Sequence, residues 1–145
     1  MDSREVLTAL HWEAPHLLVN SQGQPVGRRH VLVVDDDPAI REFLATVLDQ
    51  YEFVVHTVPD GASALARLQT EPVDVMLVDV QMPGLSGLEM AREVHKTNPS
   101  IPMALITGTP MAVPPAPLRP AGISRVFAKP FDLEALIAWL QAVPL

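Results

Sequence analysis

Residues able to hold a metal ion or act as a nucleophile stand at the ends of short apolar runs in this sequence. Three carboxylates, one hydroxyl and one ammonium share this placement, in the order Asp35, Asp36, Asp79, Thr107 and Lys129. In a parallel α/β sheet, the loops that follow the carboxyl ends of the strands converge on one edge, where ligands normally bind. If the apolar runs are neighbouring strands of one sheet, these five side chains line one small pocket.

The three carboxylates predict a site for a divalent cation. Carboxylates within about 4 Å of each other repel by about 4 kcal/mol per pair at an effective dielectric of about 20, and a cation relieves this repulsion. Oxygen ligands without cysteine or neighbouring histidine suit Mg²⁺ better than zinc. The cation and the Lys129 ammonium would then neutralise a phosphoryl group arriving at the Asp79 carboxylate, which acts as the nucleophile. The Thr107 hydroxyl would donate to a phosphoryl oxygen.

Each of these residues has a simpler structural role when it is taken alone. Asp37, next to the acidic pair, is most simply a helix cap. A threonine at a strand end commonly belongs to a turn, and a single lysine is commonly a solvated charge. The five histidines are scattered without a spacing typical of a metal site, which favours surface or core positions. The chemical hypothesis therefore depends on the five site residues acting together.

The segments that position these residues alternate between apolar runs and amphipathic stretches from His30 onward. This alternation is typical of parallel strands covered by helices on both faces. Several runs are too continuously apolar for a sheet with one face in water. Strands are predicted at residues 31–34, 53–57, 73–78, 103–107 and 126–128. Helices are predicted from Asp37–Pro38, over residues 60–69, along an apolar stripe over residues 85–94, and from Asp132.

The fourth helical position is an exception, because five prolines fall between residues 110 and 120. Each interior proline removes a backbone donor and clashes with the preceding turn, at a cost of roughly 3 kcal/mol. We therefore expect an extended or turn-rich loop over residues 109–121 in place of a regular helix.

The composition limits the class of protein. A chain of 145 residues, 48% of them apolar, fits one ordinary domain. A net charge of −7 without a basic cluster argues against direct binding of nucleic acid. The lack of cysteine excludes disulfides and thiolate metal sites. No signal peptide and no run of the roughly 20 apolar residues that span a bilayer is visible, so we expect a cytoplasmic protein with no membrane partner.

Residues 1–29 do not share the alternating pattern, and they are predicted to form an N-terminal extension and linker before a domain at residues 30–145. Residues 6–10 are compatible with a short helix and residues 16–20 with an added strand. Residues 21–29 are polar, contain two glycines and a proline, and are interpreted as a linker.

Four motifs, in this order and at these spacings, resemble those of the response-regulator receiver family of two-component signalling. They are VLVVDDDP at 31–38, LVDVQMPGLSG at 77–87, LITG at 105–108 and AKPF at 128–131. The resemblance covers roughly His30 to the C-terminus. It implies a doubly wound (βα)5 fold, a flavodoxin-like three-layer sandwich with a parallel sheet of strand order 2-1-3-4-5.

The resemblance also implies a role for each site residue. Asp79 corresponds to the phosphoacceptor, and Asp36 with the backbone carbonyl of Gln81 to the other direct protein ligands of Mg²⁺. Asp35 would act mainly through metal-bound water. Thr107 corresponds to the switch hydroxyl and Lys129 to the lysine that contacts the phosphoryl group, followed by a cis peptide bond to Pro130. In the family, the positions of Gln81 and Thr109 tune hydrolysis of the acyl phosphate, and a small residue such as Gly108 leaves the pocket open.

Two features depart from the family pattern. The family usually has Tyr or Phe three residues before the lysine, whereas this sequence has Val126, with Phe127 next to it. Adjacent strand residues face opposite sides, so Phe127 should not replace the missing aromatic. The second departure is the proline-rich segment, because the fourth helix forms the usual output face with the fifth strand and fifth helix. We expect phosphorylation chemistry to be retained and the readout to be altered.

The resemblance implies a stand-alone receiver that accepts a phosphoryl group from a sensor histidine kinase or a histidine phosphotransfer protein. It would not be an enzyme beyond its own phosphorylation and dephosphorylation. Because the chain ends after the last predicted helix, we expect output through a downstream protein target, or through a homodimer of this chain.

Two alternatives remain open. The first is a pseudo-receiver, a scaffold of the same fold that no longer accepts phosphate. The second is a phosphohydrolase with an aspartyl-phosphate intermediate at Asp35, since residues 35–37 contain Asp-x-Asp. The complete set of five pocket residues argues against the first. Pro38 directly after the triplet, and the lack of cap insertions, argue against the second.

Overall fold

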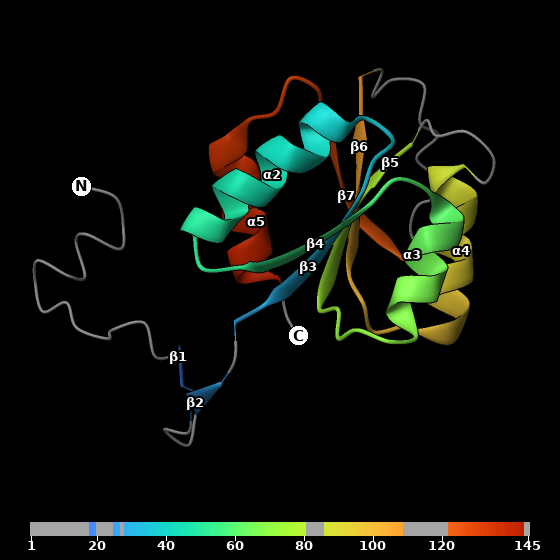
Figure 1. The fold of residues 1–145 in the computed structure, drawn as a ribbon, viewed down its shortest axis with the longest axis horizontal. Coiled ribbons are helices and arrows are strands. Elements are labelled where there is room, and N and C mark those ends of the chain that lie inside the picture. The colour runs from blue at the N-terminus through green and yellow to red at the C-terminus, as the bar shows by residue number, and fades with distance from the viewer. Residues whose placement is uncertain (1–17, 20–24, 27, 81–85, 109–121, 144–145) are drawn as a thin grey trace, which may run out of the picture.

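The computed structural model describes residues 18–19, 25–26, 28–80, 86–108 and 122–143. Its main body is a three-layer α/β domain with one parallel sheet of five strands in the order β4-β3-β5-β6-β7 (Figure 1). The strands are β3 His30–Val34, β4 Val54–Val58, β5 Val75–Asp79, β6 Met103–Thr107 and β7 Ile123–Ala128. In chain order this arrangement is 2-1-3-4-5, so the predicted fold class and strand order are confirmed.

Helices cover both faces of the sheet, as the apolar strands require. The described helices are α2 Pro38–Gln50, α3 Gly61–Leu68, α4 Gly87–Thr97 and α5 Leu133–Ala142. Helices α2 and α5 pack on one face, and α3 and α4 on the other (Figure 1). Strands β5 and β6 are buried along their whole length, because side chains on both faces lie under helices.

Each described helix begins at a side chain that caps its first turn. Asp37 accepts a hydrogen bond from the N–H of Ala39, and Pro38 follows it at the first helical position. Asp60 and Asp132 cap α3 and α5 in the same way. Ser86 forms a capping box with the third helical residue of α4. The predicted helix starts at Asp37–Pro38 and Asp132 are therefore confirmed.

The last strand is longer than predicted. It begins at Ile123 rather than Val126 and follows Gly122, whose φ of 80° is in the left-handed region that favours glycine. Ser124 and Arg125 are exposed, because β7 lies at the edge of the sheet. The pairing of β7 with β6 shifts register between Met103 and Ala104. An exposed, irregular edge strand lacks the continuous apolar run by which the other strands are recognised.

The segment before the domain contains two short strands. Strand β1, Leu18–Val19, pairs antiparallel with β2, Pro25–Val26. The strand expected within residues 16–20 is therefore present, and the segment interpreted as a linker contributes its partner. The helix expected over residues 6–10 and the proline-rich loop over residues 109–121 lie outside the described residues.

Two arginines join this segment to the domain. The Nη1 atom of Arg29 donates hydrogen bonds to the main-chain carbonyls of Leu140 and Val143, at 2.7 and 2.6 Å. These carbonyls belong to the last turn of α5, where a cation satisfies unpaired acceptors and offsets the helix dipole. Arg28 pairs with Glu52 at 3.2 Å. The chain entering β3 is thus fastened to the ends of α2 and α5.

Candidate functional site

The turn from β3 into α2 presents Asp35, Asp36 and Asp37 at the carboxyl edge of the sheet. Asp35 is fully buried, and its main-chain N–H donates to the carbonyl of Val58 at the end of β4, at 3.2 Å. One of its carboxylate oxygens accepts from the N–H of Asp37 at 2.9 Å. Asp36 and Asp37 are exposed. The acidic pair therefore has one member built into the turn and one turned toward solvent.

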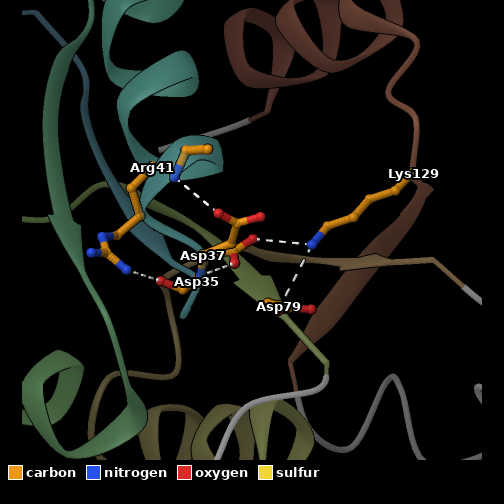
Figure 2. Close-up of polar contacts among 6 residues, drawn as sticks. Asp35, Asp37, Arg41, Asp79 and Lys129 are labelled. Atoms are coloured by element: carbon orange, nitrogen blue, oxygen red, sulfur yellow. Dashed lines mark hydrogen bonds and ion pairs between the residues drawn. The ribbon is translucent and has the colours of Figure 1, made fainter.

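Lys129 reaches across the sheet edge to this turn. Its Nζ lies 3.3 Å from Oδ2 of Asp35 and 3.8 Å from Oδ2 of Asp79 (Figure 2). The lysine follows β7, and its N–H donates to the carbonyl of Thr107 at 2.8 Å. The Lys129–Pro130 peptide bond is cis, as predicted. One ammonium thus contacts carboxylates from two strands that are not its own.

Asp79 is the last residue of β5 and is 5% exposed. Its position depends on a glycine that the sequence reading did not single out. Gly87 opens α4 and donates its N–H to the carbonyl of Val80 at 3.2 Å. A Cβ at Gly87 would overlap the main-chain carbonyl of Asp79, so only glycine allows α4 to approach the strand end this closely.

Thr107 ends β6 and is 1% exposed. Strand β6 lies beside β5, so the side chain emerges at the same edge as Asp79. Gly108, which follows, is exposed, and a Cβ added there would meet no described atom within 4 Å. The structure thus brings Asp35, Asp36, Asp79, Thr107 and Lys129 to one edge of the sheet. Gln81 and Thr109 lie outside the described residues.

The three carboxylates fit a divalent cation. Asp35, Asp36 and Asp79 each offer an oxygen atom, and these oxygens lie within 4.8 Å of one another. Two of the residues are buried and one is exposed, which leaves the group open to solvent on the Asp36 side. An all-oxygen set of this kind suits Mg²⁺, which usually retains several waters and takes only a few protein ligands. The donor set therefore agrees with the predicted cation.

Arg41 is a neighbour of the site that sequence reasoning missed. It lies in the first turns of α2, and its Nη1 donates to the main-chain carbonyl of Asp35 at 2.7 Å (Figure 2). A signal was present, because a residue four positions after the helix cap faces back toward the turn that precedes the helix. The contact itself depends on the side-chain conformation, which the sequence does not specify.

An apolar hollow adjoins the lysine. It has a volume of about 280 Å³ and is lined by Ile40, Phe43, Lys129, Pro130, Phe131 and Leu133. Phe43 is 45% exposed, which is unusual for so large an apolar side chain. The hollow lies between α2 and the turn from β7 into α5, directly beside the edge that carries the acidic cluster.

The two residues at the predicted departure from the family pattern face opposite sides of β7. Val126 packs with the side chains beneath α3 and α4. Phe127 is 5% exposed and packs beneath α2 and α5, with its ring centroid 6.0 Å from that of Trp139 in an edge-on arrangement. The expectation that Phe127 does not replace an aromatic at position 126 is therefore confirmed.

A family model described as the response regulator receiver domain matches residues 31–141 of this chain. The chain belongs to this family. Receiver domains are the modules of two-component signalling that accept phosphoryl groups from histidine kinases. The predicted family is confirmed, whereas the roles assigned to single residues stay predictions.

Named relatives and solved structures agree with this assignment. The receiver is 32% identical over 123 residues to the probable transcriptional regulatory protein TcrX of Mycobacterium tuberculosis. The aligned region covers 85% of this chain and 51% of TcrX. The chemotaxis protein CheY4 of Vibrio cholerae matches with a TM-score of 0.74 and 30% identity, over 81% of this chain and 100% of CheY4. The response regulator TrrA of Thermotoga maritima, in complex with Mg²⁺-BeF, has a TM-score of 0.70 and 29% identity, over 78% and 96% of the two chains.

The receiver spans about half the length of the first curated relatives it matches. The predicted stand-alone role, the homodimer and the cytoplasmic location stay predictions. Within the ranges that the structure describes, no helix has the length and apolar character needed to cross a bilayer.

Proposed function

We propose that this receiver takes a phosphoryl group on Asp79 in a Mg²⁺-dependent reaction, from a histidine kinase or a histidine phosphotransfer protein. One observation carries the proposal. The Asp79 carboxylate shares the sheet edge with two further carboxylates whose oxygens lie within 4.8 Å, and Lys129 Nζ is 3.8 Å from it. The Mg²⁺-BeF complex of the related TrrA supports this assignment.

In the proposed transfer, an Asp79 carboxylate oxygen forms a bond to phosphorus while the bond from phosphorus to the donor imidazole nitrogen breaks. The nitrogen keeps the electron pair of that bond. Asp35, Asp36 and Asp79 would hold Mg²⁺, and Gln81 would add a backbone carbonyl. When bound, Mg²⁺ supplies positive charge that offsets the negative charge of the phosphoryl group.

Lys129 and Thr107 act on the oxygens of the transferred group. The Lys129 ammonium is already placed at the Asp79 carboxylate, so it can donate to a phosphoryl oxygen without a large movement. The Thr107 hydroxyl donates to another phosphoryl oxygen from the neighbouring strand end. In hydrolysis, a water oxygen forms a bond to phosphorus while the bond from phosphorus to the Asp79 oxygen breaks, which returns the free carboxylate and inorganic phosphate. We propose no other turnover, so the protein is a phosphoacceptor rather than an enzyme with an external substrate.

We propose that the protein that donates the phosphoryl group docks on the apolar hollow beside Lys129. Phe43, which lines the hollow, is 45% exposed, and Lys129, which also lines it, contacts the Asp79 carboxylate. Phe43→Ala is expected to slow transfer from the phosphoprotein roughly tenfold, in line with the loss of an interface anchor. Transfer from a small phosphodonor should stay unchanged, and equal loss with both donors would contradict this role for the hollow.

The proposed function is tested by incubating the protein with Mg²⁺ and acetyl phosphate and locating the modified residue by mass spectrometry. We expect one phosphoryl group on Asp79, lost in Asp79→Asn and after chelation of Mg²⁺. A folded wild-type protein that takes no label would support the pseudo-receiver. Turnover of a phosphate ester that is lost in Asp35→Asn and retained in Asp79→Asn would support the phosphohydrolase.

We further propose that the readout of phosphorylation differs from the usual coupling of a threonine to an aromatic residue. Val126 lies where that aromatic is expected, and Phe127 packs on the opposite face against Trp139. Amide spectra recorded with and without beryllofluoride are expected to show no chemical-shift changes in β7 of the kind that a reorienting aromatic ring causes. An altered readout would be contradicted if the largest changes occurred at the usual switch site and at a formed helix over residues 110–120.

A further inference from the structure

Arg41 touches the acidic turn, yet the proposed phosphoryl transfer gives it no role. Its guanidinium Nη1 donates a hydrogen bond of 2.7 Å to the main-chain carbonyl of Asp35. The arginine side chain is half-buried and comes from α2, on the side of Asp35 that faces away from Lys129 (Figure 2). Asp35 is therefore held between two cations, one at its carbonyl and one at its carboxylate.

The carbonyl that Arg41 holds belongs to the peptide unit that joins Asp35 to Asp36. Because a peptide unit is planar, fixing this carbonyl also fixes the direction in which the chain enters Asp36. The other polar groups of Asp35 also form hydrogen bonds. Its N–H donates to the carbonyl of Val58, and its carboxylate accepts from the N–H of Asp37 and from Nζ of Lys129.

The Asp36 carboxylate has no comparable support. It is exposed, and within the part of the chain that the structure describes it makes no hydrogen bond or ion pair of its own. Its oxygen nevertheless lies within 4.8 Å of oxygens of both Asp35 and Asp79. The position of this oxygen therefore depends on the main chain that precedes it, and Arg41 is the side chain that holds that main chain.

We propose that Arg41 is a positioning residue that presents Asp36 to the metal ion, by holding the peptide between Asp35 and Asp36. This inference rests on the proposed Mg²⁺ site. Groups that orient metal ligands from outside the coordination shell typically contribute a factor of about 10 to 100 in metal affinity. Here the orienting contact acts on the backbone of the ligand rather than on its carboxylate.

A second effect of Arg41 has the opposite sign. A guanidinium near a cation site repels the cation, so removing its charge alone would strengthen Mg²⁺ binding. For a half-exposed side chain, solvent and salt screen this repulsion. The hydrogen bond to the carbonyl is short and direct, and its loss frees the peptide plane to rotate. We therefore expect the positioning effect to be the larger one, so that removing Arg41 weakens Mg²⁺ binding.

The test measures the Mg²⁺ dissociation constant by titration calorimetry with MgCl₂ alone, together with the melting temperature of each variant. Arg41→Met keeps the apolar stem and removes both the charge and the donors, whereas Arg41→Lys keeps a charged donor. Arg92→Met is the matched control, because Arg92 is exposed on α4 and has no hydrogen bond or ion pair among the described residues. We expect about tenfold weaker Mg²⁺ binding in Arg41→Met, substantial recovery in Arg41→Lys and no change in Arg92→Met.

Unchanged or tighter Mg²⁺ binding in a folded Arg41→Met variant would overturn the proposal, and so would an equal loss in Arg41→Lys. If Arg41→Met does not fold, Arg41→Gln replaces it with the same expectation, and unchanged binding again overturns the proposal. Because the measurement uses Mg²⁺ without a phosphodonor, it is separate from labelling of Asp79. A wild-type protein that binds Mg²⁺ but takes no phosphoryl group would refute the proposed function while the result for Arg41 stands.

Discussion

Strand β3 carries a polar cluster near each end, and the two clusters differ in how their groups are satisfied. At its carboxyl end, three carboxylates have oxygens within 4.8 Å of one another, and the Lys129 ammonium contacts two of them. At its amino end, Nδ1 of His30 lies 3.1 Å from Nε2 of His56 on the neighbouring strand. The first cluster has two more negative than positive charges, whereas the second forms a hydrogen bond within itself.

The geometry of the histidine pair supports this contrast. The ring planes are inclined by only 10° and the ring centroids are 5.4 Å apart. This separation is close to the largest that two imidazoles joined by a 3.1 Å contact can have, so the rings meet edge to edge. One nitrogen donates and the other accepts, as two neutral imidazoles can. Polar groups that complete their own hydrogen bonds support the fold, whereas buried like charges require an outside ion.

The largest expected effect comes from removing Lys129, whose ammonium contacts two carboxylates. Lys129→Ala is expected to slow phosphorylation by acetyl phosphate roughly 100-fold, because the ammonium no longer stabilises the charge of the phosphoryl group. Its loss also removes a positive charge from beside the Asp35 and Asp79 carboxylates, so Mg²⁺ should bind more tightly. Rates measured by mass spectrometry at saturating Mg²⁺, with titration calorimetry for the metal, test both points. Weaker Mg²⁺ binding would show that Lys129 supports the cluster rather than competing with the metal.

A smaller effect is expected from crowding the same end of the sheet. Gly87→Ala places a Cβ on the main-chain carbonyl of Asp79, so α4 must move away from the strand. We expect a loss of about 2 kcal/mol in the free energy of unfolding, typical of added atoms in a packed region. Gly108→Ala is the matched control, because its Cβ meets no described atom within 4 Å. Equal urea midpoints for the two variants would refute the close approach of α4 to β5.

The family resemblance predicted the strand order. The meeting of the five site residues was predicted from their placement, because each lies at or just after the carboxyl end of a strand. The sequence was not sufficient for contacts that depend on side-chain conformation or on an irregular edge. The start of β7 was missed because Ser124 and Arg125 are polar and exposed. His30 and His56 are far apart in sequence, and only the pairing of β3 with β4 brings them together.

The smallest expected effect is a pH dependence at the amino end of β3. Burial, and then the neighbouring His30 and Arg67, lower the pKa of His56, while Glu71 acts in the opposite direction. The folded protein therefore favours neutral His56, whereas the unfolded chain binds a proton below about pH 6.5. This stabilisation is complete above that pH and is lost as the pH falls through the lowered pKa of the folded state.

Proton spectra of the His56 ring should accordingly show a titration midpoint below that of an unfolded histidine. His30→Gln should raise this midpoint, because it removes one of the groups that disfavour the charged form. The phosphorylation rate at Asp79 should not change in His30→Gln, since the pair lies at the opposite end of β3. A midpoint for His56 at or above the ordinary value would contradict the lowered pKa of His56 in the folded protein. It would also remove the contrast between the two ends of the strand.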